Sequence, residues 1–252
     1  MPSQRPPHDT LLAFDTSTER LAVALSRAGR DWTADEPGGA AASANLIPCA
    51  ERLLGEAGVT WPELDAIAFG RGPGAFTGLR TSCAVAQGLA VGLERPLLAI
   101  DSLLIVAEDT RRQAAPEGTR FEVDVVMDAR MGEVYAGRYR WDHGRWSVLR
   151  SAQLLTPQAL ADRWQQAPPA ALAGTALLAL ADSPWQGAVT SDRQWPHEAS
   201  RARALASLAL AAWTDGATVD AAEALPTYLR NKVALTTAER DAVRLAKAAD
   251  SA

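Results

Sequence analysis

Short apolar runs alternate with polar turn residues through the first hundred positions of the chain. Residues 11–14, 21–25 and 30–34 predict three strands, whose close spacing is typical of an antiparallel meander. Apolar side chains then recur at helical intervals from Ser43, which can cap a helix, to Ala57. A strand, a helix, a strand and a helix are predicted next, over residues 64–69, 81–93, 96–100 and 103–111. These elements predict an α/β fold.

The order of elements restarts after a polar break at residues 112–119. Strands are predicted over residues 123–127, 133–140, 146–155, 170–173 and 225–229, and helices over 156–165, 200–213 and 237–249. Residues 183–198 predict irregular structure. Because each half opens with a strand that ends in an aspartate, Asp15 or Asp128, we expect an internal structural duplication.

This duplication would divide the 252-residue chain into two lobes and a tail. We place the N-terminal lobe at residues 9–111, with helix 200–213 packing back on it, the second lobe at 120–199 and the tail at 234–252. No apolar run approaches the roughly 18 residues of a membrane-spanning helix. The polar, proline-rich start lacks the features of a signal peptide, so we expect a cytoplasmic protein without membrane contact.

Charge, cysteine and histidine content narrow the functions to be considered. The formal net charge of −5 argues against direct nucleic-acid binding, because such domains usually carry a basic face. Cys49 and Cys83 fall in predicted helices and are expected to be buried free thiols. The three histidines, His8, His143 and His197, show no helical pairing that would hold a metal ion. Neither a metal site nor a self-contained hydrolase is expected.

A glycine-rich segment at residues 70–80 (GRGPGAFTGLR) joins a predicted strand to a predicted helix. Its spacing is neither that of a dinucleotide-binding motif nor that of a P-loop, because no lysine follows the last glycine. A rigid turn that packs the helix on the sheet is the favoured interpretation. The alternative is that free N–H groups at the start of the helix hold an anion.

Asp15 and Asp128 could also meet across a cleft and flank a nucleotide phosphate with its Mg²⁺. A carboxylate at the end of a strand suits such a hard cation. Taken singly, each aspartate is more simply explained by an ordinary turn, in which its side chain accepts backbone hydrogen bonds. Both interpretations stay open at this point.

Small residues line one face of the helix that follows the glycine-rich segment, where Ala84, Gly88 and Gly92 lie one turn apart. Glycine inside a helix costs about 1 kcal/mol relative to alanine, so a compensating contact is expected. Small residues at this spacing let another helix approach closely. Four residues of the predicted helix 43–57 could extend this patch: Leu46, Ile47, Ala50 and Leu53. A protein–protein face and packing of Gly88 inside its own domain are equally open.

Four segments together resemble one bacterial protein family, TsaB, also called YeaZ. They are residues 14–18 (FDTST), 70–80, 128–135 (DARMGEVY) and 226–231 (PTYLRN), in matching order and spacing across residues 10–233. The resemblance implies a two-lobed actin-like (ASKHA) fold. It also implies a non-catalytic scaffold or activating subunit in the formation of N6-threonylcarbamoyladenosine (t6A) in tRNA.

The resemblance further implies partners. The subunit would pair with TsaD, the metal-containing catalytic relative, through helices 43–57 and 76–93, and the ATPase TsaE would dock on the pair. A homodimer would form in isolation, and tRNA would be reached only through the complex. No cofactor is expected on this chain alone, and ATP or ADP would bind at the complex interface. The catalytic relative has a His-x-x-x-His metal motif on the helix matching 43–57, which has no histidine here.

Within this family, five residues would mark a vestigial nucleotide cleft: Asp15, Thr16, Gly72, Gly74 and Asp128. Two rival functions stay open beside the scaffold. An active nucleotide-binding phosphotransferase of the same fold would bind ATP as an isolated chain. A peptidase, suggested by the family's older glycoprotease naming, is disfavoured because the metal ligands are missing.

Overall fold

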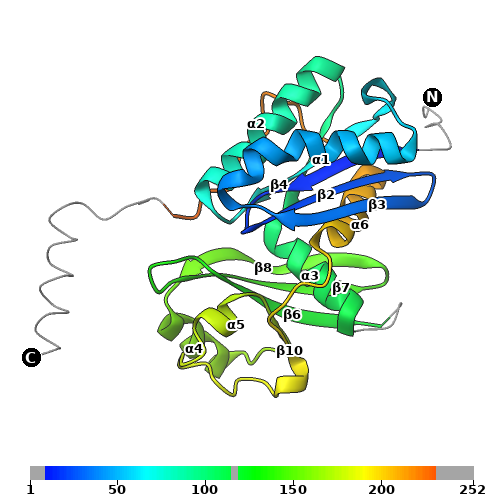
Figure 1. Cartoon of the computed structure of the whole chain (residues 1–252). Coiled ribbons are helices and arrows are strands. Elements are labelled where there is room, and N and C mark those ends of the chain that lie inside the picture. Colours follow the sequence, from blue (N-terminus) through cyan, green and yellow to red (C-terminus); the bar gives the residue numbers. More distant parts are fainter. Residues whose placement is uncertain (1–8, 115–118, 231–252) are drawn as a thin grey trace, which may run out of the picture.

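Two mixed five-stranded sheets, one above the other in Figure 1, form the two lobes of the chain. The computed structural model describes residues 9–114 and 119–230. The first sheet has the order β3-β2-β1-β4-β5 and consists of β1 (Thr10–Asp15), β2 (Arg20–Arg27), β3 (Arg30–Pro37), β4 (Ala66–Gly72) and β5 (Leu97–Asp101). Its first three strands pair antiparallel, which confirms the predicted meander, whereas β4 pairs parallel with both β1 and β5.

The second sheet repeats this arrangement. Its strands are β6 (Phe121–Asp128), β7 (Val134–Asp142), β8 (Arg145–Leu155), β9 (Leu172–Ala173) and β10 (Gln194–Trp195), in the order β10-β9-β6-β7-β8. As in the first sheet, the opening strand is central, with two antiparallel strands on one side and two parallel strands on the other. The shared topology confirms the predicted duplication. It also places Asp15 and Asp128 at equivalent strand ends.

Helices cover both faces of the first sheet because its strands alternate in side-chain direction. One face packs against α1 (Ala42–Ala57) and α2 (Phe76–Leu93) through larger residues such as Phe14 and Phe69. The other face is rich in alanine and packs against α6 (Arg201–Thr214), whose own alanines allow a close approach. Helix α6 therefore belongs to the core of the first lobe although it follows the second sheet in the chain.

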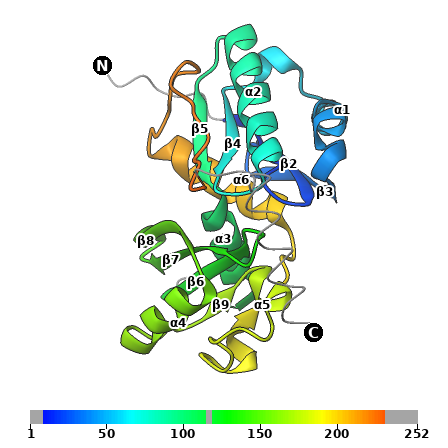
Figure 2. The same ribbon diagram turned by 90° about the vertical axis from the view of Figure 1, so that its left-hand side faces the viewer.

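Helix α3 (Ser102–Ala114) lies between the lobes, as both views show (Figure 1, Figure 2). Ile105 packs in the alanine-rich core of the first lobe, whereas Leu103 and Val106 pack against the second sheet. The opposite face of the second sheet is covered by α4 (Pro157–Gln166) and α5 (Ala176–Ala179). One helix thus joins the hydrophobic cores of both lobes.

Several predicted elements need correction. The predicted strand 225–229 is not a strand but an extended segment without a ladder. Part of the predicted irregular stretch 183–198 forms the short strand β10. Ser43 does not cap α1, which begins at Ala42 after a short 3-10 turn. The predicted helix 237–249 and the tail 234–252 lie outside the described residues, and the bounds of the lobes stay a prediction.

Two simpler expectations can be compared directly with the structure. Cys49 and Cys83 are buried and free, as predicted. Among the described residues, no helix combines the length and apolar character that crossing a membrane requires.

Candidate functional site

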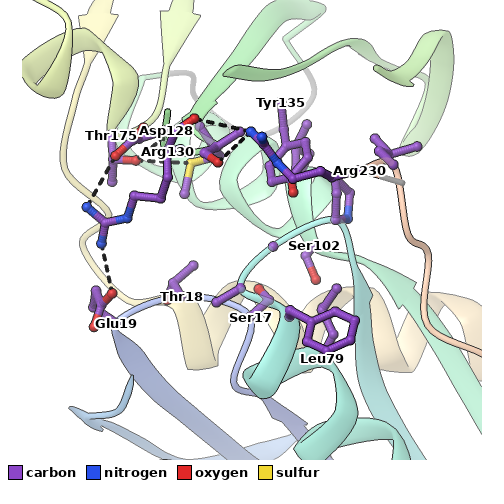
Figure 3. Close-up of a pocket in the computed structure, with 18 of the residues that line it drawn as sticks. Ser17, Thr18, Glu19, Leu79, Ser102, Asp128, Arg130, Tyr135, Thr175 and Arg230 are labelled. Carbon is purple, nitrogen blue, oxygen red and sulfur yellow. Dashed lines mark hydrogen bonds and ion pairs between the residues drawn. The ribbon is translucent and has the colours of Figure 1, made fainter. Parts of the chain in front are cut away.

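A cleft of about 500 Å³ opens between the lobes, and its volume lies within the range of small-molecule pockets. The first lobe contributes the turn after β1, including Ser17 and Glu19. The second lobe contributes the loop after β6, including Asp128 and Arg130, which face the first-lobe residues in Figure 3. Residues 227–230 complete the wall.

The five cleft residues expected from the sequence fall into two groups. Gly74 and Asp128 line the cleft. Asp15, Thr16 and Gly72 are buried and do not line it, so the expectation that they form its surface is wrong. Their polar groups are directed into the protein, where the turn after β1 packs against the glycine-rich segment.

The Asp15 carboxylate is fully buried and hydrogen-bonded within the chain. Its Oδ1 accepts from the backbone N–H and the hydroxyl of Ser17 at 2.9 and 2.7 Å, and its Oδ2 accepts from the Ser102 hydroxyl at 2.8 Å. Burial alone would raise the pKa of Asp15. Arg201 and these hydrogen bonds outweigh the effect of burial and hold the pKa below its ordinary value. The bonds within residues 15–17 are those of the ordinary turn that the sequence favoured.

Arg201 is a site residue that the sequence did not indicate. It is the first residue of α6, only 1% exposed, and its Nε lies 3.2 Å from Asp15 Oδ1. Its Nη1 pairs with Glu198 at 2.7 Å, and its Nη2 donates to the Ser17 hydroxyl and the Ser102 carbonyl, both at 3.1 Å. An arginine at the start of an alanine-rich helix carries no signal of such a role.

The glycine-rich segment packs tightly on the turn after β1. A Cβ added to Gly70 would collide with the Asp15 carboxylate, and one added to Gly78 would collide with the Thr16 carbonyl. Thr16 also donates a hydrogen bond of 2.6 Å to the Gly78 carbonyl. These contacts confirm the favoured interpretation of a rigid turn that packs α2 on the sheet.

At the mouth of the cleft, Arg130 links the two lobes. Its backbone N–H donates to Asp128 Oδ1 at 2.8 Å, and its Nη2 pairs with Glu19 across the cleft at 3.0 Å (Figure 3). The side chains of Arg130 and Glu19 are 73% and 75% exposed. Exposed pairs of this kind contribute only about 0–1 kcal/mol, so this link is weak.

A strap at residues 224–230 makes a second link between the lobes. Its Thr227 N–H donates to the Arg71 carbonyl at 2.7 Å, and its Tyr228 ring lies 5.3 Å from the Phe76 ring on α2. Its last residue, Arg230, reaches the loop after β6, where it pairs with Glu133 at 2.7 Å. The strap thus joins α2 to the second lobe beside the cleft.

The small-residue face of α2 is open. Ala84, Gly88 and Gly92 are exposed, and a Cβ added to either glycine would meet no atom of the described residues within 4 Å. Within residues 9–114 and 119–230, Gly88 therefore does not pack against its own domain. Val91, on the same helix, is 71% exposed.

The predicted contribution of α1 to that face is largely wrong. Leu46, Ala50 and Leu53 are buried in the core of the first lobe, and only Ile47 is partly exposed. The apolar stripe of α1 faces the sheet, because burying this stripe is what stabilises an amphipathic helix in a globular protein. The exposed face of α1 is mostly polar and includes Asn45, Pro48 and Arg52.

Comparison with known proteins agrees with the resemblance to the TsaB family that the sequence motifs indicated. A family model described as TsaD, tRNA N6-adenosine threonylcarbamoyltransferase, matches residues 37–174. The tRNA threonylcarbamoyladenosine biosynthesis protein TsaB of Escherichia coli (strain K12) is 34% identical over 239 residues, which cover 89% of this chain and 96% of that protein. The chain belongs to the TsaB family. TsaB of Haemophilus influenzae is also 34% identical, over 89% of this chain and 94% of its own length.

The solved structures extend this family likeness to the fold. YeaZ from Pseudomonas aeruginosa matches this TsaB-family chain with a TM-score of 0.75 and 39% identity, covering 88% of this chain and 100% of YeaZ. Together with the two repeated sheets, this confirms the predicted α/β fold of two lobes, each a mixed sheet with flanking helices. Among the described residues, no group of three or more His, Cys, Asp or Glu side chains could hold a metal ion.

Proposed function

We propose that this TsaB-family chain takes part in forming t6A in tRNA, as a non-catalytic scaffold or activating subunit in the cytoplasm. The observation that carries the proposal is the 34% identity over 96% of E. coli TsaB, a protein named for this biosynthesis. Two features of the chain support the non-catalytic part. Asp15 is engaged in an internal ion pair, and α1 contains no histidine.

TsaD is the proposed partner, and the exposed small-residue face of α2 is the proposed contact. Ala84, Gly88 and Gly92 leave a shallow surface on which a partner helix can lie close to the backbone. Ile47 and the polar face of α1 would border it. TsaE would dock on the pair, with ATP or ADP at the complex interface, and the isolated chain would form a homodimer through the same face. The net charge of −5 supports contact with tRNA only through the complex.

The t6A role is tested by nucleoside mass spectrometry of tRNA after depletion of this protein. We expect the t6A signal to fall and the unmodified adenosine to rise, with both restored by expression of the wild-type chain. Unrelated tRNA modifications serve as the internal control. Unchanged t6A after verified depletion would overturn the proposal.

The contact is tested separately with Gly88→Leu and co-purification with TsaD. A leucine here points into open space, so the chain should stay folded while the added side chain blocks the approach of a partner helix. Gln165→Leu adds the same exposed side chain on α4 of the other lobe and is the matched control. We expect the control to pair normally and Gly88→Leu not to pair. Normal yield of the complex from Gly88→Leu would reject this interface.

A further inference from the structure

In an actin-like fold, a divalent cation bound with a nucleotide is expected at the position of Asp15. The hydrogen bonds that the Asp15 carboxylate already accepts show whether such a group fits here. Oδ1 already accepts three hydrogen bonds, from Ser17 N–H, the Ser17 hydroxyl and Arg201 Nε. Oδ2 accepts from Ser102, and Gly70 packs so closely that a Cβ there would collide with this oxygen. A carboxylate that is completely buried and this fully engaged offers no lone pair to a metal ion in the cleft.

Arg201 is engaged to the same extent. Four of its five N–H groups are used, by Asp15, Glu198, the Ser17 hydroxyl and the Ser102 carbonyl. These partners come from the end of β1 and the turn after it, the start of α3 and the segment before α6. The guanidinium is therefore held from several directions by elements that are distant in the sequence.

The other strand-end aspartate has an arginine of its own. Asp128 Oδ1 accepts from the Arg130 N–H, and Asp128 Oδ2 lies 3.4 Å from Arg130 Nη1. The two carboxylates that could have flanked a phosphate and its Mg²⁺ are thus each paired with a guanidinium, through a buried arginine at Asp15 and a largely exposed one at Asp128. At the Asp15 position, the residues present do not fit a metal–nucleotide group.

We infer that Arg201 is a built-in counter-cation, which neutralises Asp15 in place of a divalent ion and closes this position to metal–nucleotide binding. The positive charge that a ligand would bring to the base of the cleft is supplied by α6. The nearby Glu198 carboxylate adds a second negative charge, so removal of Arg201 leaves two uncompensated carboxylates close to one another. Such a pair is a ligand set that a hard divalent cation prefers.

Cation rescue tests the inference. Arg201→Met keeps an unbranched apolar side chain but removes the guanidinium with its charge and its hydrogen-bond donors. We expect millimolar Mn²⁺ to raise the Tm of Arg201→Met by about 3–5 °C, as ligand linkage in a chain of this size predicts. Mn²⁺ should not move the Tm of the wild type, nor that of the matched double variant Asp15→Asn/Arg201→Met. A folded Arg201→Met variant that Mn²⁺ does not stabilise would overturn the inference.

A second measurement needs only the wild-type chain. Mn²⁺ broadens NMR signals of nuclei near its binding site, so the amide signals of Ser17 and Ser102 report directly on Asp15. We expect them to stay sharp with Mn²⁺ alone and with Mn²⁺ and ATP. Selective broadening of these signals would overturn the inference, even if Arg201→Met fails to fold. Sharp signals would support it and would also count against the rival phosphotransferase function.

Discussion

The phenolic hydroxyl of Tyr139 donates a hydrogen bond of 2.9 Å to the carboxylate of Asp101. Tyr139 lies on β7 of the second lobe and is fully buried, whereas Asp101 ends β5 of the first lobe. Asp101 Oδ1 accepts from the Leu103 and Leu104 N–H groups at 2.8 and 3.4 Å. The same carboxylate therefore caps α3 and ties the second lobe to the helix between the lobes.

Replacing Tyr139 with phenylalanine should destabilise the fold by about 1–3 kcal/mol, because it leaves a buried carboxylate oxygen without its donor. Urea unfolding measures this directly. Tyr135→Phe on the same strand is the matched control, since Tyr135 lines the cleft, and its effect should stay within about 0.5 kcal/mol. Equal effects of the two substitutions would show that the Tyr139–Asp101 bond does not stabilise the lobe junction.

The environment of Asp101 predicts that the stability of the fold depends on pH. Burial raises its pKa above the ordinary value of 3.8, despite the hydrogen bonds from Tyr139, Leu103 and Leu104. A carboxyl group with a raised pKa in the folded state binds its proton more tightly there than in the unfolded chain. Its contribution to the free energy of unfolding therefore falls as the pH rises from 3.8 through the folded pKa.

Asp101→Asn removes this titration. Relative to the wild type, the variant should gain stability as the pH rises through that window, and the difference should level off above it. Unfolding in urea at a series of pH values, from mildly acidic to neutral, measures the difference. If it does not change with pH, the buried carboxyl group does not titrate differently in the folded and unfolded states.

The strands and the duplication were predictable because they depend on local patterns. β1, for example, is a short apolar run that ends at the turn residues beginning with Asp15, and the same pattern recurs at β6. The strap was wrongly predicted as a strand, because its apolar residues suit one. In the structure the Tyr228 ring packs against Phe76 of α2, Leu229 packs with the core of the second lobe, and the Thr227 N–H makes its bond to a carbonyl outside any ladder.

The site was less predictable because its contacts join distant positions. The Arg201–Asp15 pair spans 186 residues, and no local pattern distinguishes this arginine from a solvent-exposed one. Helix α1 shows a second limit. The spacing of Leu46, Ala50 and Leu53 predicts an apolar stripe but not what the stripe packs against, and here it is the sheet rather than a partner.

Arg230 should stabilise the loop after β6. Its Nη2 donates to the carbonyls of Ala129 and Arg130 at 3.0 and 3.2 Å and pairs with Glu133, with only 15% of its side chain exposed. Within this loop Arg130, Met131 and Gly132 all have positive φ, a backbone shape that needs support from its surroundings.

Arg230→Gln should therefore cost about 1–3 kcal/mol and speed amide hydrogen exchange in residues 130–133. Arg145→Gln is the control. It removes another ion pair, with Asp215, that is 2.9 Å long but largely exposed, so we expect a change within about 0.5 kcal/mol and no effect on the loop. Unchanged exchange in Arg230→Gln would mean that the loop holds its shape without the strap.

Gly78 and Gly88 lie on the same helix, and the structure predicts opposite effects for the same substitution. A Cβ at Gly78 would collide with the Thr16 carbonyl, so Gly78→Ala should destabilise the fold by about 1–3 kcal/mol. A Cβ at Gly88 meets nothing, so Gly88→Ala should gain about 0.5–1 kcal/mol from helix propensity alone. Each variant controls for the other in thermal or urea unfolding. A stability gain at Gly88 would show that the fold of the described residues does not require this glycine, as the proposed partner contact at this face predicts. A loss of stability in Gly88→Ala comparable to that in Gly78→Ala would contradict the observation that this face of α2 is open.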